Sequence, residues 1–275
     1  MLKGIAFRKL DLAHCGKDKI LVERFLTIHF AAEFPDIGVC LISDTAVSTK
    51  KNDESRKRVS TTKKVFYSNR GSGVLVAGAG NGDLCDSVLR GLIKDERQAN
   101  TPESVASWMQ KTFPELANGK GAEFIVAGRD RDRLNEFQIA VLQSQPSAHQ
   151  CLAIVPQQKQ HATIGFQATV FNAEFCGYLQ KNIQRMLNFS PAVPEKVWSI
   201  VADSREGFAL GIIGGGLVGL AQDVVSGNKW EEMIGGPWTA TCIPLSGPIF
   251  QTSGEMYNGA KLFTGAHIDA SSSQS

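Results

Sequence analysis

Four residues whose types could together support nucleophilic catalysis follow one another in the first third of the chain. Thr27 begins an apolar stretch, Asp44 ends the next one, and Lys64 stands just before a third. A glycine turn that contains Gly78 follows a fourth. A threonine hydroxyl is a weak nucleophile until a base removes its proton, and a nearby ammonium lowers its pKa. A carboxylate can hold that ammonium in place, and the backbone N–H groups of a glycine turn that opens a helix can stabilise an oxyanion.

The apolar stretches that carry these residues are predicted to be short β-strands. Residues 27–34 and 38–44 flank the turn signal Pro35-Asp36, which favours a tight antiparallel hairpin. Residues 65–67 and 73–77 predict two more strands around a polar turn. The strands would therefore bring their ends, and the polar residues there, into one region.

Helices and strands are clustered along the chain rather than alternating. Four helices are expected from apolar spacing and from proline or threonine at their starts, over residues 82–93, 102–116, 172–187 and 194–203. Strand signals fill the stretches between, and the glycine-rich apolar residues 208–222 are predicted as a strand. This clustering indicates an α+β fold and argues against a doubly wound parallel sheet.

Composition excludes several classes of function. The 275 residues are 43% hydrophobic and 20% charged with a net charge of +2, so a dominant nucleic-acid surface is not expected. The basic run 48–64 is interpreted as a solvated surface loop. The six cysteines form no CxxC pair and no histidine cluster stands beside them, so no metal is predicted. The glycines after Gly78 lack the third one of a dinucleotide turn, because that position is Asp83, and no cofactor is predicted.

No targeting or membrane segment stands out. Charged residues interrupt the first twelve positions, and the most apolar stretch, residues 208–221, is judged too short to span a bilayer. We therefore expect a cytoplasmic protein without a membrane partner.

The order and spacing of these motifs resemble the proteasome β-subunit branch of the N-terminal nucleophile (Ntn) hydrolases. Residues 38–45 match the family's apolar strand closing in aspartate, and residues 60–65 match its Lys-Lys-Val step into the next strand. Residues 77–80 match its Ala-Gly turn, and residues 124–130 match its later Ala-Gly-x-Asp strand. The resemblance runs from Thr27 to about residue 220.

The resemblance implies a four-layer αββα sandwich of two antiparallel sheets over residues 27–250. Residues 1–26 would be a leader or extra element, and residues 251–275 a C-terminal extension. Thr27 would be the nucleophile, Lys64 its electrostatic activator, Asp44 the partner of Lys64, and the N–H of Gly78 the oxyanion donor. The implied activity is cleavage of peptides or unfolded proteins in a homo-oligomeric ring, with an ATPase partner.

Other interpretations of the same residues stay open. Threonine is common in strands, Asp44 is suited to cap a turn, and Lys64 is one of many basic residues in its segment. Leu26 precedes Thr27, where self-cleaving relatives carry glycine, and Thr27 has no free amine unless residues 1–26 are removed. The alternative is a non-catalytic, structural member of the fold. Amide hydrolysis or acyl transfer on a small molecule would use the same nucleophile.

Overall fold

The computed structural model describes most of the chain from residue 24 to residue 253. The described residues are 24–25, 27–49, 57–61, 64–68, 73–95, 100–130, 132–133, 136–145, 151–155, 160–200, 202–231, 234 and 237–253. Most of the predicted leader over 1–26 and of the extension over 251–275 lies outside these residues, and both stay predictions. Of the basic run 48–64, residues 48–49 and 57–61 form strands rather than the predicted surface loop, and most of the others lie outside the described residues.

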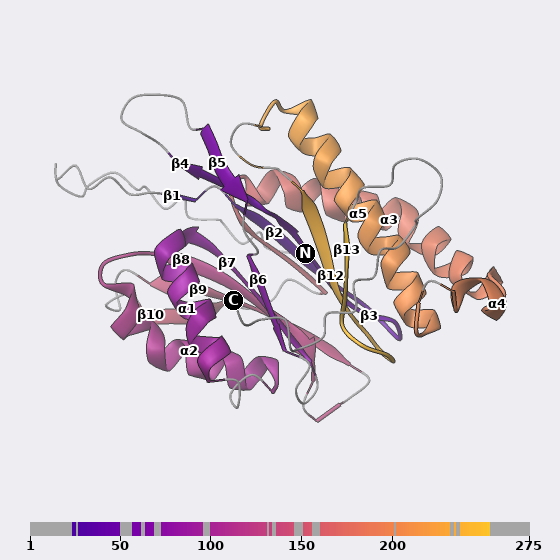
Figure 1. Ribbon diagram of the computed structural model, residues 1–275, viewed down its shortest axis with the longest axis horizontal. Helices are drawn as coiled ribbons and strands as arrows, with labels where there is room; N and C mark the ends of the chain where they lie inside the picture. Colours follow the sequence, from indigo (N-terminus) through magenta and orange to yellow (C-terminus); the bar gives the residue numbers. More distant parts are fainter. Residues whose placement is uncertain are drawn as a thin grey trace, which may run out of the picture.

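Two antiparallel sheets form the middle of the molecule (Figure 1). The first contains β1 (Arg24–Phe25), β6 (Val65–Ser68), β7 (Val74–Asn81), β8 (Ala122–Arg129), β9 (Phe137–Gln145) and β10 (Cys151–Val155). Its strand order is β1-β7-β8-β9-β10, and β6 also pairs with β7. The second contains β2 (Ile28–Phe34), β3 (Gly38–Asp44), β11 (His161–Gly165), β12 (Trp238–Pro244) and β13 (Phe250–Ser253), in the order β11-β2-β3-β12-β13. A separate two-stranded sheet joins β4 (Ala46–Thr49) and β5 (Lys57–Thr61).

Helices cover the outer face of each large sheet (Figure 1). α1 (Gly82–Lys94) and α2 (Pro102–Ala117) share a hydrophobic cluster with β7 and β8. α3 (Ala168–Ala192) and α5 (Arg205–Gly227) share another with β2, β3 and β12, and the short α4 (Glu195–Trp198) lies between these helices in the chain. A third cluster contains side chains from both sheets and fills the space between them. The predicted α+β sandwich with layers αββα is confirmed.

The predicted hairpin over residues 27–44 is confirmed as β2 and β3. Its turn places Asp36 at φ 60° and Gly38 at φ 150°, and Ile37 donates its N–H to the carbonyl of Phe34 at 3.0 Å. A Cβ on Gly38 would lie 2.2 Å from the carbonyl oxygen of Ile243, so only glycine lets β12 approach this closely. The register that follows places β3 between β2 and β12, with every one of its residues buried.

The prediction of a strand over residues 208–222 is wrong, because these residues belong to the helix α5. Ser204 caps the helix by accepting the N–H of Gly207 at 2.9 Å. Apolar residues occupy nearly every side of α5, so no amphipathic period marks it in the sequence. Gly214 explains part of the glycine content, since a Cβ there would lie 2.9 Å from the Cβ of Ala240 on β12.

The length of α5 also corrects the estimate that this stretch is too short to span a bilayer. The helix has 23 residues and by length and composition could cross a membrane. In this structure 61% of its most apolar window is buried, and it packs against β12 and α3. We therefore assign α5 to the hydrophobic core of the sandwich.

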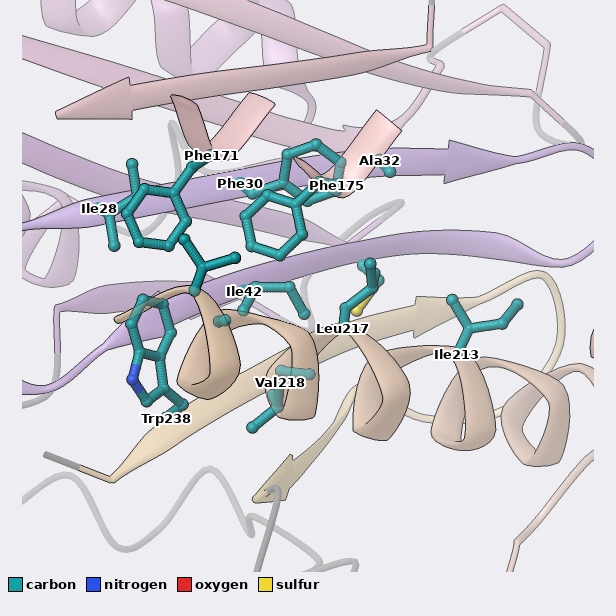
Figure 2. Packing of buried hydrophobic residues seen from close by; sticks show 14 of the residues in the cluster. Ile28, Phe30, Ala32, Ile42, Phe171, Phe175, Ile213, Leu217, Val218 and Trp238 are labelled. Atoms are coloured by element: carbon teal, nitrogen blue, oxygen red, sulfur yellow. The ribbon is translucent and has the colours of Figure 1, made fainter. Parts of the chain in front are cut away.

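Aromatic side chains anchor β2 beneath the second helical layer. The rings of Phe30 and Phe175 stack with centroids 4.3 Å apart, and Phe171 lies beside Phe175 at 5.8 Å. Figure 2 shows these rings between β2 and α3, and it shows Leu217 of α5 beside the neighbouring strand. This packing fixes the strand that begins directly after Thr27.

The contact between α5 and β12 predicts opposite effects for two adjacent glycines. Gly214→Ala should lower the free energy of unfolding by about 1–3 kcal/mol, because the added methyl group overpacks against Ala240 and Cys40. Gly215→Ala is the matched control, since a Cβ there meets nothing within 4 Å and alanine favours the helix by about 1 kcal/mol. Urea unfolding of both variants measures this, and equal shifts would contradict the packing described here.

Candidate active site

The structure brings Thr27, Lys64 and Asp44 together. The Nζ of Lys64 donates to the Oγ1 of Thr27 at 2.5 Å and to the Oδ2 of Asp44 at 2.8 Å. The side chains of Lys64 and Asp44 are only 8% and 0% exposed. The second carboxylate oxygen, Oδ1, accepts the N–H of Ile28 at 3.1 Å. Asp44 therefore holds both the lysine and the backbone next to the threonine.

Three strand ends position this triplet, as the sequence pattern predicts. Thr27 precedes β2, Asp44 ends β3, and Lys64 precedes β6. β6 belongs to the first sheet and the other two strands to the second. The ion pair therefore links the two sheets of the sandwich at the hydroxyl of Thr27.

The carbonyl side of Thr27 is held by the turn after β11. The N–H of Phe166 donates to the carbonyl of Thr27 at 2.8 Å. Gly165 before it has φ 99°, and a Cβ there would lie 2.0 Å from the same oxygen. Only glycine fits this position, and the contact with Thr27 that imposes this requirement cannot be seen in the sequence.

Burial acts on the charge of the lysine. Desolvation lowers the pKa of Lys64 below its usual value, while the carboxylate of Asp44 opposes this shift through its charge and hydrogen bond. An ammonium kept charged by Asp44 favours removal of the proton from the Thr27 hydroxyl beside it.

A cavity of about 290 Å³ lies beside Thr27 and is partly open to solvent. Its wall comprises Thr27, Lys64, Gly78, Gly80, Gly82, Asp83, Cys85, Asp86, Leu89 and Arg90. Gly78 of β7 thus faces the same space as the threonine hydroxyl, on the side where α1 begins. Burial raises the pKa of the Cys85 thiol to about 12, so this group is neutral at neutral pH and is a poor competing nucleophile.

Charged residues at the mouth of the cavity come mainly from α1. Asp86 pairs with Arg90 at 2.6 Å, and Asp83 pairs with Lys120 at 3.3 Å. All four side chains are largely exposed, so these pairs contribute little to stability. Their place makes them available to a bound molecule.

One buried residue of the site was missed by sequence reasoning, which found no pattern among the histidines. His29 on β2 is fully buried, and its Nε2 lies 3.0 Å from the carbonyl oxygen of Gly78. Burial, and then the charge of Lys64, lowers the pKa of His29 from 6.5 to about 3. The imidazole is therefore neutral at physiological pH. No sequence signal marks this contact, because 49 residues separate the partners.

The backbone of residues 24–25 adds an edge strand to β7. In this antiparallel pairing Arg24 lies opposite Asn81 and Phe25 opposite Gly80. The chain that leads into Thr27 therefore runs along the strand that carries Gly78.

In the part of the chain that the structure describes, no group of three or more histidine, cysteine, aspartate or glutamate residues is arranged to hold a metal ion.

Comparison with known proteins shows a likeness at the level of the fold. No protein-family profile matches the chain. No curated protein sequence matches it either. Among solved structures, Anbu (ancestral beta-subunit) from Yersinia bercovieri superposes with a TM-score of 0.50 and 14% identity, covering 83% of this chain and 88% of that one. The Gly-1 mutant of Anbu from Hyphomicrobium sp. strain MC1 gives a TM-score of 0.49 and 13% identity, over 82% of this chain and 86% of that one.

The likeness defines the architecture of the chain. The chain has the proteasome-like Ntn fold, the two-sheet sandwich with outer helices that it shares with Anbu from Yersinia bercovieri. At such low identity the likeness concerns the fold alone, and the roles of Thr27, Asp44, Lys64 and Gly78 stay predictions.

Because buried His29 is neutral, the free energy of unfolding should depend on pH through this residue. The folded-state pKa of about 3 lies below the ordinary value of 6.5, so between these pH values the unfolded chain binds a proton that the folded chain does not. Stability contributed by this group is present above pH 6.5 and is lost as pH falls toward 3, by up to about 1.4 kcal/mol per pH unit. In His29→Gln this part of the dependence should vanish.

Unfolding by urea at several pH values between 4 and 7 measures the difference between wild type and His29→Gln. His161→Gln is the control, because His161 lies on β11 and is partly exposed. Parallel stability profiles for wild type and His29→Gln would contradict a buried, neutral His29.

Proposed function

We propose that the protein is a proteasome-like threonine peptidase with Thr27 as its nucleophile. The observation that carries the proposal is the hydrogen-bonded chain from Asp44 through Lys64 to the Thr27 hydroxyl, beside an open cavity. A strand threonine without a function would not need a buried lysine at 2.5 Å from its Oγ1. The shared fold with Anbu is consistent with this proposal.

The proposed chemistry assigns one step to each group. Once residues 1–26 are removed, the α-amine of Thr27, with an unperturbed pKa near 8, accepts the hydroxyl proton. The oxygen attacks the carbonyl carbon of a peptide bond, and the amine passes the proton to the leaving nitrogen. The acyl ester on Thr27 is then hydrolysed by water, which regenerates the hydroxyl.

The other predicted residues stabilise charge in this scheme. Lys64 lowers the pKa of the hydroxyl, and Asp44 keeps Lys64 in place and charged. Gly78 lines the cavity with Thr27, and its N–H would donate to the oxyanion of the tetrahedral intermediate. The charged mouth formed by α1 would contact the substrate.

Removal of the leader is required for this mechanism. In the intact chain the nitrogen of Thr27 is an amide, which cannot accept a proton at neutral pH. The pairing of residues 24–25 with β7 brings the chain shortly before Thr27 beside the strand that carries Gly78. On the grounds of the sequence resemblance, the proposal extends to peptides or unfolded proteins as substrates and to an ATPase partner. The proposed cytoplasmic location rests on the sequence pattern alone, in which no targeting segment stands out.

The same strand supports a second candidate function. If the leader is kept, residues 24–25 stay paired with β7 and Thr27, which is 2% exposed, stays internal and without a base. The protein would then be a non-catalytic, structural subunit with a proteasome-like fold.

Substitution of Thr27 separates the two candidates. Thr27→Ala should give a folded, full-length protein without measurable turnover of peptide substrates, a loss of at least about 10³-fold, because both processing and hydrolysis need the hydroxyl. Thr27→Ser keeps the hydroxyl and should retain processing and part of the activity. Intact-mass spectrometry and a fluorogenic peptide assay measure both effects.

The decisive comparison is wild type against Thr27→Ala. A wild-type mass that begins at Thr27, with turnover, supports the peptidase. Full-length masses for both proteins and no turnover in wild type would replace it with the structural subunit.

An oligomer is expected from the resemblance, with a ring as the proposed arrangement. A ring would enclose the threonine and keep it from folded proteins. Size-exclusion chromatography with light scattering should give a mass several times the 29.8 kDa of the chain. A monomer at all concentrations would count against the peptidase.

A further inference from the structure

His29 is the one fully buried side chain of the site to which the proposed mechanism gives no task. It is 0% exposed, lies two residues after Thr27, and reaches from the second sheet to the first. A hydrogen bond joins its Nε2 to the carbonyl oxygen of Gly78 at 3.0 Å. Burying an imidazole here costs free energy that its single hydrogen bond offsets only in part, because Nδ1 has no partner among the described residues.

The chemistry of this bond fixes the tautomer of the ring. A carbonyl oxygen only accepts hydrogen bonds, so Nε2 must carry the hydrogen. The pKa of about 3 keeps the ring neutral, which leaves Nδ1 without a proton. Nδ1 is buried and has no hydrogen-bond partner among the described residues. His29 is thus a neutral donor aimed at one acceptor.

The geometry of an extended strand connects this acceptor to the reacting atoms. In an antiparallel strand the N–H and C=O of one residue point to the same edge. The carbonyl of Gly78 points to His29, so the N–H of Gly78 points to the same edge of β7 as this carbonyl. Thr27 lies at that edge, because Lys64, directly before the β6 strand that pairs with β7, donates to its hydroxyl, and both Thr27 and Gly78 border the cavity.

We propose that His29 is a positioning residue that holds the peptide group of Gly78, through Nε2–H···O=C, so that the N–H of Gly78 faces the oxygen of the substrate carbonyl. This inference rests on the peptidase proposed above and assigns a further residue to its oxyanion site. Gly78 needs such support because it directly follows Ala77, the last residue of β7 that pairs with β6.

A role as general base is a different idea, and the geometry opposes it. Nε2 is engaged by Gly78, and Nδ1 has no hydrogen-bond partner in the described part of the chain to exchange a proton with. The Thr27 hydroxyl accepts its hydrogen bond from Lys64. His29 therefore acts through Gly78 and not on the substrate.

The test uses two substitutions of nearly equal shape that differ in one donor. In His29→Gln the amide nitrogen is as many bonds from the backbone as Nε2 and can donate to Gly78, whereas His29→Met has no donor there. The processed His29→Met enzyme should lose roughly 10- to 100-fold in kcat with KM little changed, because the oxyanion donor is misplaced. His29→Gln should retain most of wild-type kcat. His161→Met is the control outside the site and should behave as wild type.

The outcomes separate this inference from the proposed function. If wild type is active and His29→Gln and His29→Met have equal kcat values, whether both high or both low, the positioning role is overturned. The proposed peptidase function is then unaffected. A processed wild type without activity overturns the peptidase, and the positioning role with it. Recovery of kcat by glutamine alone supports the inference.

A second measurement covers the case that His29→Met does not fold. In ¹⁵N NMR spectra of histidine-labelled wild type, Nε2 should be protonated and Nδ1 unprotonated throughout pH 5–8. A ring protonated on Nδ1, or one that titrates in this range, would overturn the inference without reference to activity.

Discussion

The buried ion pair between Lys64 and Asp44 is the interaction on which the site depends. Its 2.8 Å contact joins a residue before β6 to the end of β3, so it ties the two sheets together at Thr27. Removing one partner of such a pair leaves a charge without compensation in the interior, at a cost of about 3–5 kcal/mol. An apolar pair would stabilise the sandwich as well, so the charges are better explained by what they do to the hydroxyl between them.

Both sheets are needed to build this arrangement. The second sheet supplies Thr27, His29 and Asp44 from one hairpin, and its aromatic packing against α3 holds that hairpin. The first sheet supplies Lys64, which lies just before β6, and Gly78, which lies just after the part of β7 that pairs with β6. The threonine lies where the sheets meet, so small relative shifts of the sheets would separate the lysine from its two partners.

Local sequence signals predicted much of this structure, because the hairpin and the first two helices depend on turn, cap and apolar patterns within short stretches. The grouping of the candidate site residues was predicted from the order of the motifs that carry them along the chain. The failures have physical causes. Residues 208–222 form a helix apolar on nearly all sides, and its glycines serve contact with β12 rather than a strand. His29 contacts Gly78 across the sandwich, and Gly165 contacts Thr27 between the neighbouring strands β11 and β2 of one sheet. No spacing along the chain encodes either contact.

The two sides of Thr27 are held by different means. Its carbonyl is locked by Phe166 and the close backbone of Gly165, whereas the segment before it is joined to β7 by the pairing of residues 24–25. Detaching that segment would leave the anchor on the carbonyl side intact. Removal of the segment would then change the nitrogen of Thr27 from an amide to an amine. The hydroxyl would already be in place beside Lys64, so the site would become reactive without refolding.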